Sequence, residues 1–180
     1  AAPTVSNGRI YVVGVNNEVI ALQASDGNEI WRAPGAGEQA AAMASPSVAV
    51  EGAFVLAPAT TADISAYSSA SGMQLWTVSL TPADPSSAQA NLNDVAARPV
   101  LSAGVAVAIS NSGRMVAVNA RSGATIWEHD LAGTQTPWVA GGSVFVMNGK
   151  DTLMALSLKT GRLRWQKVLP KGSWAGPVLA

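Results

Sequence analysis

The sequence predicts an all-β fold made of four repeated units, and two observations support this prediction. A Gly-x-x-x-Trp signature occurs four times in the 180 residues, as Gly27 to Trp31, Gly72 to Trp76, Gly123 to Trp127 and Gly161 to Trp165. Each signature follows a proline (Pro3, Pro46, Pro99 or Pro137), and the proline-to-tryptophan distances are 28, 30, 28 and 28 residues. Chance does not maintain such a register, so the chain is interpreted as a repeat protein.

The elements follow one another in the same order within each unit. A proline-led apolar run comes first, and a turn glycine separates it from a second apolar run. These turn glycines are Gly8, Gly52, Gly104 and Gly142. A polar turn and an alternating stretch follow, such as Met115-Val116-Ala117-Val118 in the third unit. Short apolar runs bounded by turn residues predict β-strands, so each unit is expected to hold three strands before its signature.

The last turn and the last strand of each unit contain the signature itself. Its glycine is the second residue of an Asp-Gly, Ser-Gly or Thr-Gly pair, where glycine takes a positive φ without a steric penalty. The strand after this turn carries the tryptophan. Four short strands per unit, a period of roughly 40 to 50 residues and no helical periodicity are typical of propeller blades. The sequence therefore predicts a β-propeller of four-stranded antiparallel blades.

The expected blades span about residues 3–35, 46–80, 99–131 and 137–169, and residues 177–180 are expected to be the first strand of a further blade. A single four-stranded sheet cannot bury both of its faces, so neighbouring blades must share a core. We expect Trp31, Trp76, Trp127 and Trp165 to pack between adjacent sheets. Four blades and the beginning of a fifth favour the interpretation that these residues are an internal fragment of a longer chain. The alternative is that two chains associate through open end blades to complete a ring of eight blades.

Composition argues against several function classes. With 11 basic and 11 acidic side chains the net charge is zero, which disfavours nucleic acid as a partner. The chain has no cysteine, so disulfides and thiolate metal sites are excluded. His129 is the only histidine and is expected in a surface loop, and the carboxylates are scattered singly. We therefore expect no catalytic residues, no metal and no cofactor.

One connection differs from the others and indicates a contact surface. From Trp76 to Pro99 it runs 23 residues, against 15, 10 and 12 elsewhere. Its polar, Pro/Ser-rich middle, residues 81–90, is expected to be a protruding loop that either binds a partner or is simply solvated. Trp138 and Trp174 lie outside the repeated tryptophan position and are expected to line the axial funnel or fill a gap between blades.

The repeat also carries a family resemblance. The pattern from Ala21-Leu22 to Trp31, from Ala117-Val118 to Trp127 and from Ala155-Leu156 to Trp165 resembles the tryptophan-docking repeat of eight-bladed propellers of the pyrroloquinoline-quinone type. The segments 92–100, 113–117 and 133–139 resemble the BamB family more specifically, in particular its alphaproteobacterial members.

That resemblance implies a non-enzymatic lipoprotein scaffold on the periplasmic side of the outer membrane. Such a scaffold would dock to the periplasmic domains of a BamA-like protein and aid the insertion of outer-membrane proteins, with unfolded outer-membrane proteins as a further candidate partner. The lipid anchor of the family is expected outside these residues. The resemblance places Asp94 at the partner-binding surface, with Asn93 and Arg98 as neighbouring candidates, whereas Ala96 replaces a second acid of the family pattern. Asp94 could equally cap a turn.

Two alternatives share the repeat. One is a quinoprotein dehydrogenase, a class that typically uses an adjacent cysteine pair and a calcium ion held by Glu, Asn and Asp. This chain has no cysteine and no acidic cluster. The other is a non-catalytic sensor or adhesion module. The sequence favours the assembly scaffold over both.

Overall fold

A computed structural model describes residues 2–14, 16–35, 47–59, 61–82, 97–149, 151–172, 174 and 176–177. These residues form four separate antiparallel sheets of four strands each, and the strands of each sheet are hydrogen-bonded in chain order. The described ranges contain no helix, and so none that could cross a membrane. The predicted all-β propeller fold with four-stranded blades is confirmed.

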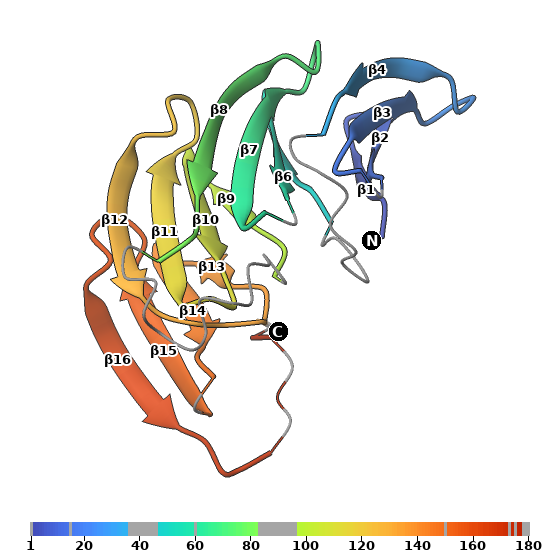
Figure 1. Ribbon diagram of the computed structural model, residues 1–180. Coiled ribbons are helices and arrows are strands. Elements are labelled where there is room, and N and C mark those ends of the chain that lie inside the picture. The colour runs from blue at the N-terminus through green and yellow to red at the C-terminus, as the bar shows by residue number, and fades with distance from the viewer. Residues whose placement is uncertain are drawn as a thin grey trace.

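The four sheets are numbered here in chain order and are arranged as a fan (Figure 1). Sheet 1 consists of β1 (Thr4–Ser6), β2 (Arg9–Val13), β3 (Val19–Gln23) and β4 (Glu29–Ala33). Sheet 2 consists of β5 (Ala49–Glu51), β6 (Phe54–Pro58), β7 (Asp63–Ser68) and β8 (Gln74–Ser79). Sheet 3 consists of β9 (Val100–Ser102), β10 (Val105–Ile109), β11 (Arg114–Asn119) and β12 (Thr125–Asp130). Sheet 4 consists of β13 (Trp138–Ala140), β14 (Ser143–Met147), β15 (Thr152–Ser157) and β16 (Leu163–Val168).

The first strand of each sheet lies on the inner side of the fan. Strands β1 and β5, β5 and β9, and β9 and β13 contact one another across the sheet boundaries. The fourth strands, β4, β8, β12 and β16, lie on the outer side (Figure 1). The short first strands, of three residues each, therefore bring the beginnings of successive repeats together.

Three apolar cores fill the spaces between neighbouring sheets. Tyr11 and Val19 of sheet 1 pack with Val55 of sheet 2. On sheet 3 the two faces serve different cores because side chains alternate along a strand. Ala106 faces sheet 2, whereas Val107 faces sheet 4. Each interior sheet is thus buried on both faces, which explains the low charged fraction of 12%.

A shared irregularity precedes the tryptophan strand in every sheet. The ladder between the third and fourth strands shifts register at the same place each time, directly after an alanine paired with the tryptophan. The four pairs are Ala21 with Trp31, Ala66 with Trp76, Ala117 with Trp127 and Ala155 with Trp165. A bulge bends and twists its strand locally. In sheets 1, 2 and 3 the tryptophan that follows the bulge lies against the next sheet.

Three of the four signature tryptophans are hydrogen-bonded to the next sheet. In each case the indole Nε1 donates to a backbone carbonyl three residues before the signature glycine of that sheet. The three bonds join Trp31 to Ser69 (3.0 Å), Trp76 to Ala120 (2.9 Å) and Trp127 to Leu158 (2.8 Å). We call this arrangement the indole junction.

The signature glycine completes each indole junction. Gly72, Gly123 and Gly161 have φ values of 73°, 72° and 67°, a region that favours glycine. The ring of the preceding sheet's tryptophan lies directly against them. A Cβ built on these glycines would come within 2.5 to 2.8 Å of a ring atom, closer than real contacts allow. The glycine is therefore required both for its backbone conformation and for the close approach of the indole.

Trp165 differs from the expected inter-sheet packing. Its side chain is 46% exposed, whereas Trp31 and Trp127 are each 8% exposed. Its ring contacts Phe145 of its own sheet, with ring centroids 5.9 Å apart. The physical reason is that no further sheet follows sheet 4 among the described residues.

The indole junction predicts unequal effects of two glycine substitutions in sheet 3. Gly123→Ala places a Cβ 2.7 Å from Trp76 Cγ, whereas Gly104→Ala, at a similar φ of 75° against 72°, has nothing within 4 Å of the built Cβ. Both variants lose about 1–2 kcal/mol to backbone strain, and we expect Gly123→Ala to lose roughly 1–3 kcal/mol more through overpacking. Urea unfolding monitored by tryptophan fluorescence measures the difference. Equal losses in the two variants would show that the indole contact is unimportant.

Candidate partner-binding surface

The sequence-predicted partner residues fall partly outside the described structure. Asn93, Asp94 and most of the loop at 81–90 lie outside the described residues. Arg98 is described and exposed, two residues before β9. Its Nε donates a hydrogen bond, at 3.0 Å, to the carbonyl of Val48, which directly precedes β5 of sheet 2. This bond fixes the Nε atom of the Arg98 guanidinium at the boundary between sheets 2 and 3.

Arg98 lies at the edge of a pocket that we call the inner-strand pocket, because β5, β9, β13 and the residues before them form it. Its volume is about 230 Å³. It is lined by Ala49, Val50, Arg98, Pro99, Val100, Leu101, Thr136, Pro137, Trp138 and Val139. Most of these side chains are apolar, and Arg98 is their one charged member.

The inner-strand pocket combines a cation with exposed apolar surface. Trp138 is 39% exposed, which favours a contact role for this ring over packing. The terminal nitrogens of Arg98 donate no hydrogen bond to the described part of the chain. A guanidinium with free N–H groups is suited to a planar carboxylate, and an aromatic ring beside it supplies contact area. The pocket could therefore bind an acidic side chain flanked by apolar residues.

The repeat pattern could have predicted this pocket from the sequence. Arg98 and Thr136 each precede the proline that begins a unit, and the first strands of successive units lie side by side. Residues at equivalent repeat positions are therefore neighbours in space. Sequence reasoning predicted Arg98 from a family resemblance alone, and it did not connect Arg98 with Trp138.

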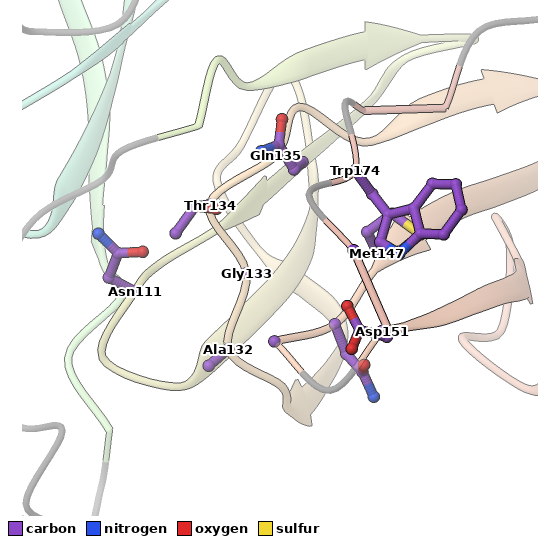
Figure 2. A pocket seen from close by; sticks show the side chains of 11 residues that line it. Asn111, Ala132, Gly133, Thr134, Gln135, Met147, Asp151 and Trp174 are labelled. Atoms are coloured by element: carbon purple, nitrogen blue, oxygen red, sulfur yellow. The ribbon is translucent and has the colours of Figure 1, made fainter. Parts of the chain in front are cut away.

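A second pocket lies among the loops of sheets 3 and 4, and Figure 2 shows it from close by. Its volume is about 270 Å³. It is lined by Asn111, Ala132, Gly133, Thr134, Gln135, Met147, Asn148, Gly149, Asp151, Gly172 and Trp174. Trp174 is 39% exposed, and its Nε1 donates to the Pro170 carbonyl at 3.2 Å. Amide groups and a single carboxylate make this pocket more polar than the inner-strand pocket.

His129 does not contribute to either pocket. It lies in β12 and not in the expected surface loop, because the tryptophan strand continues three residues beyond Trp127, to Asp130. Its Nε2 is 2.8 Å from the Gly161 carbonyl, and its ring centroid is 5.4 Å from that of Trp127. His129 is therefore part of the junction between sheets 3 and 4. Within the described ranges, no three His, Cys, Asp or Glu residues lie close enough together to hold a metal ion.

Glu29, Arg32 and Tyr67 have shifted pKa values, and none of these three residues lines either pocket. A hydrogen bond from Arg32 lowers the pKa of Glu29, and the same pair raises the pKa of Arg32. Arg32 and Glu29 are 2.8 Å apart on the exposed strand β4. Burial raises the pKa of Tyr67, which favours its neutral form in the core. The shifts of Glu29 and Arg32 thus follow mainly from their own hydrogen bond, and that of Tyr67 follows from burial.

The family model described as "Outer membrane protein assembly factor BamB" matches residues 1–167. A similar curated relative is the outer membrane protein assembly factor BamB of Shigella dysenteriae, which is 26% identical over 204 residues. The match covers 90% of this chain and 52% of the relative. The chain thus spans about half the length of the curated relatives that it matches.

Solved structures show the same fold. BamB from Moraxella catarrhalis superimposes with a TM-score of 0.75 at 18% identity, over 92% of this chain and 50% of that one. Quinohemoprotein alcohol dehydrogenase from Comamonas testosteroni superimposes with a TM-score of 0.73 at 15% identity, over 94% of this chain and 35% of that one. At these identities the structures establish the propeller fold alone.

The family match covers the repeats, the indole junctions and the residues around the inner-strand pocket. The curated relatives carry the same family description. The chain therefore belongs to the family of the outer membrane protein assembly factor BamB.

Proposed function

We propose that this chain is a non-catalytic scaffold of the machinery that assembles outer-membrane β-barrel proteins. It acts on the periplasmic side of the outer membrane, where a lipid anchor holds the parent protein. Its partner is the periplasmic part of a BamA-like protein, and unfolded outer-membrane proteins are a second class of partner. Membership of the BamB family supports the assembly role.

The inner-strand pocket is the observation that carries the docking proposal. Arg98, two residues before β9, and Trp138, the first residue of β13, are exposed at short strands that contact one another across sheets 2, 3 and 4. Arginine and tryptophan are enriched among the residues that dominate binding energy at protein interfaces. Rigid strands hold both side chains without a large loss of conformational entropy on binding. The pocket is thus suited to a protein partner.

Asn93 and Asp94 extend the same surface in our proposal. They lie four to five residues before Arg98 in the chain, next to the connection at residues 81–90. A carboxylate near the guanidinium would make the surface mixed in charge, which favours a partner that presents both a base and an acid. The alternative role of Asp94, capping a turn, predicts an effect on stability without an effect on affinity.

The dehydrogenase alternative has weaker support. The similarity to the alcohol dehydrogenase is limited to the fold. Proteins with many unrelated functions share one fold, so the similarity does not indicate the same activity. Calorimetry with pyrroloquinoline quinone and Ca²⁺ tests this alternative directly. Saturable binding of the quinone would favour the dehydrogenase class and count against the scaffold.

The docking proposal predicts that charge reversal at Arg98 weakens partner binding. We expect Arg98→Glu to lower the affinity for BamA periplasmic domains at least about tenfold, because the pocket loses its carboxylate-binding group. Arg121→Glu is the matched control, since Arg121 is exposed in the turn between β11 and β12, outside both pockets. Biolayer interferometry measures the affinities. Equal affinities of the two variants would exclude Arg98 from the interface.

A second prediction separates the two roles of Asp94. If Asp94 contacts the partner, Asp94→Arg lowers affinity several-fold and leaves the urea midpoint close to that of the parent chain. Asp130→Arg provides the control, because Asp130 is exposed at the end of β12. A variant that binds normally but is less stable by about 1 kcal/mol would assign Asp94 to a turn.

A further inference from the structure

The first strand of each sheet has a free edge. Strands β1, β5, β9 and β13 each stand at the end of their sheet and pair with one neighbouring strand only. For β9 that neighbour is β10, and within the described ranges no backbone hydrogen bond joins the other edge of β9 to the rest of the chain. The N–H and C=O groups along a free strand edge can pair with a further strand.

The free edge of β9 lies beside the inner-strand pocket. Val100 and Leu101 of β9 line this pocket, as do Arg98 before β9 and Trp138 of β13. Its walls come from sheets 2, 3 and 4, and the first strand of sheet 3 contacts the first strands of both sheet 2 and sheet 4. Described residues therefore form the pocket walls, whichever sheets adjoin sheets 1 and 4 in the parent protein.

The location of the pocket favours an extended segment over a folded surface as its ligand. Strands β9 and β13 lie on the inner side of the fan (Figure 1), and the inner side of a propeller surrounds a central channel. A single extended segment can lie along a channel, whereas the face of a folded domain is too broad to reach the channel wall. A segment that pairs with a sheet edge gains affinity from main-chain hydrogen bonds and specificity from pockets for alternate side chains.

The pocket also determines which side chains such a segment must present. Arg98 is held through its Nε, and its terminal nitrogens donate no hydrogen bond to the described residues, so they are suited to a carboxylate. The exposed ring of Trp138 is suited to an apolar side chain. Residues i and i+2 of an extended segment point to the same side. The acid and the apolar residue both face the pocket when one residue separates them.

We propose that the inner-strand pocket binds an extended segment of the partner that adds to the free edge of β9. The segment presents an acidic residue and a large apolar residue at positions i and i+2, with the carboxylate on Arg98 and the apolar side chain against Trp138. This inference rests on the docking role proposed above and specifies the element of the partner that docks. Because β9 has only three residues, side chains supply most of the selectivity.

Calorimetric titration of the chain with eight-residue peptides tests the motif. The test peptide is Gly-Ser-Thr-Glu-Thr-Phe-Thr-Ser, and the control peptide, Gly-Ser-Thr-Thr-Glu-Phe-Thr-Ser, has the same composition with Glu and Phe adjacent. Both ends are blocked, so the Glu side chain supplies the only carboxylate. We expect the test peptide to bind at least about tenfold more tightly than the control. Equal affinities, or binding by neither peptide, would overturn the proposal.

Backbone methylation tests the pairing with β9. Successive N–H groups of an extended peptide point to opposite edges, so only alternate ones can bond to β9. One variant of the test peptide carries N-methyl groups on Glu and Phe, and the other carries them on the threonine after each of these residues. We expect one variant to keep its affinity and the other to lose at least about tenfold. Loss in both variants, or in neither, would contradict strand addition.

Two protein variants locate the peptide in the pocket. Arg98→Gln and Trp138→Ala are each expected to weaken binding of the test peptide at least about tenfold. Arg121→Gln is the control for Arg98→Gln, because Arg121 is exposed in the turn between β11 and β12. Trp174→Ala is the control for Trp138→Ala, because Trp174 is also 39% exposed and lies outside the inner-strand pocket. Normal affinity in both test variants would exclude this pocket as the site.

Competition with the periplasmic domains of BamA separates this inference from the docking proposal. We expect saturating test peptide to weaken binding of those domains, because both ligands use the inner-strand pocket. If the domains bind in an Arg98-dependent manner while no peptide binds, the docking proposal stands and the extended-segment inference is wrong. If the peptides bind as expected and the domains do not bind, the motif specificity stands and BamA is not the partner.

Discussion

The whole arrangement depends on the indole junction, in which a tryptophan of one sheet packs on the turn glycine of the next and donates to a backbone carbonyl. Apolar packing alone is not directional and would let two sheets slide past each other. A buried N–H without an acceptor is unfavourable, so the hydrogen bond fixes one position of each sheet relative to its neighbour. That position brings the first strands together, and their contacts create the inner-strand pocket.

The repeat made the fold predictable, because the same glycine and tryptophan mark a turn and a docking strand four times. Two features were not evident from the pattern. The bulge opposite each tryptophan depends on strand pairing, which a linear pattern of apolar residues does not specify. The sequence predicted a surface loop at His129, and this prediction was wrong because β12 extends through His129 to Asp130.

The candidate site was less predictable than the fold, because it is assembled from equivalent positions in different repeats. Arg98 was predicted from a resemblance, but its partners in the pocket come from sheets 2 and 4. Trp138 is outside the repeated tryptophan position, so nothing in the repeat assigned it a packing role. Its exposure and its position beside the start of β9 are properties of the assembled sheets. Asn93 and Asp94 stay predictions.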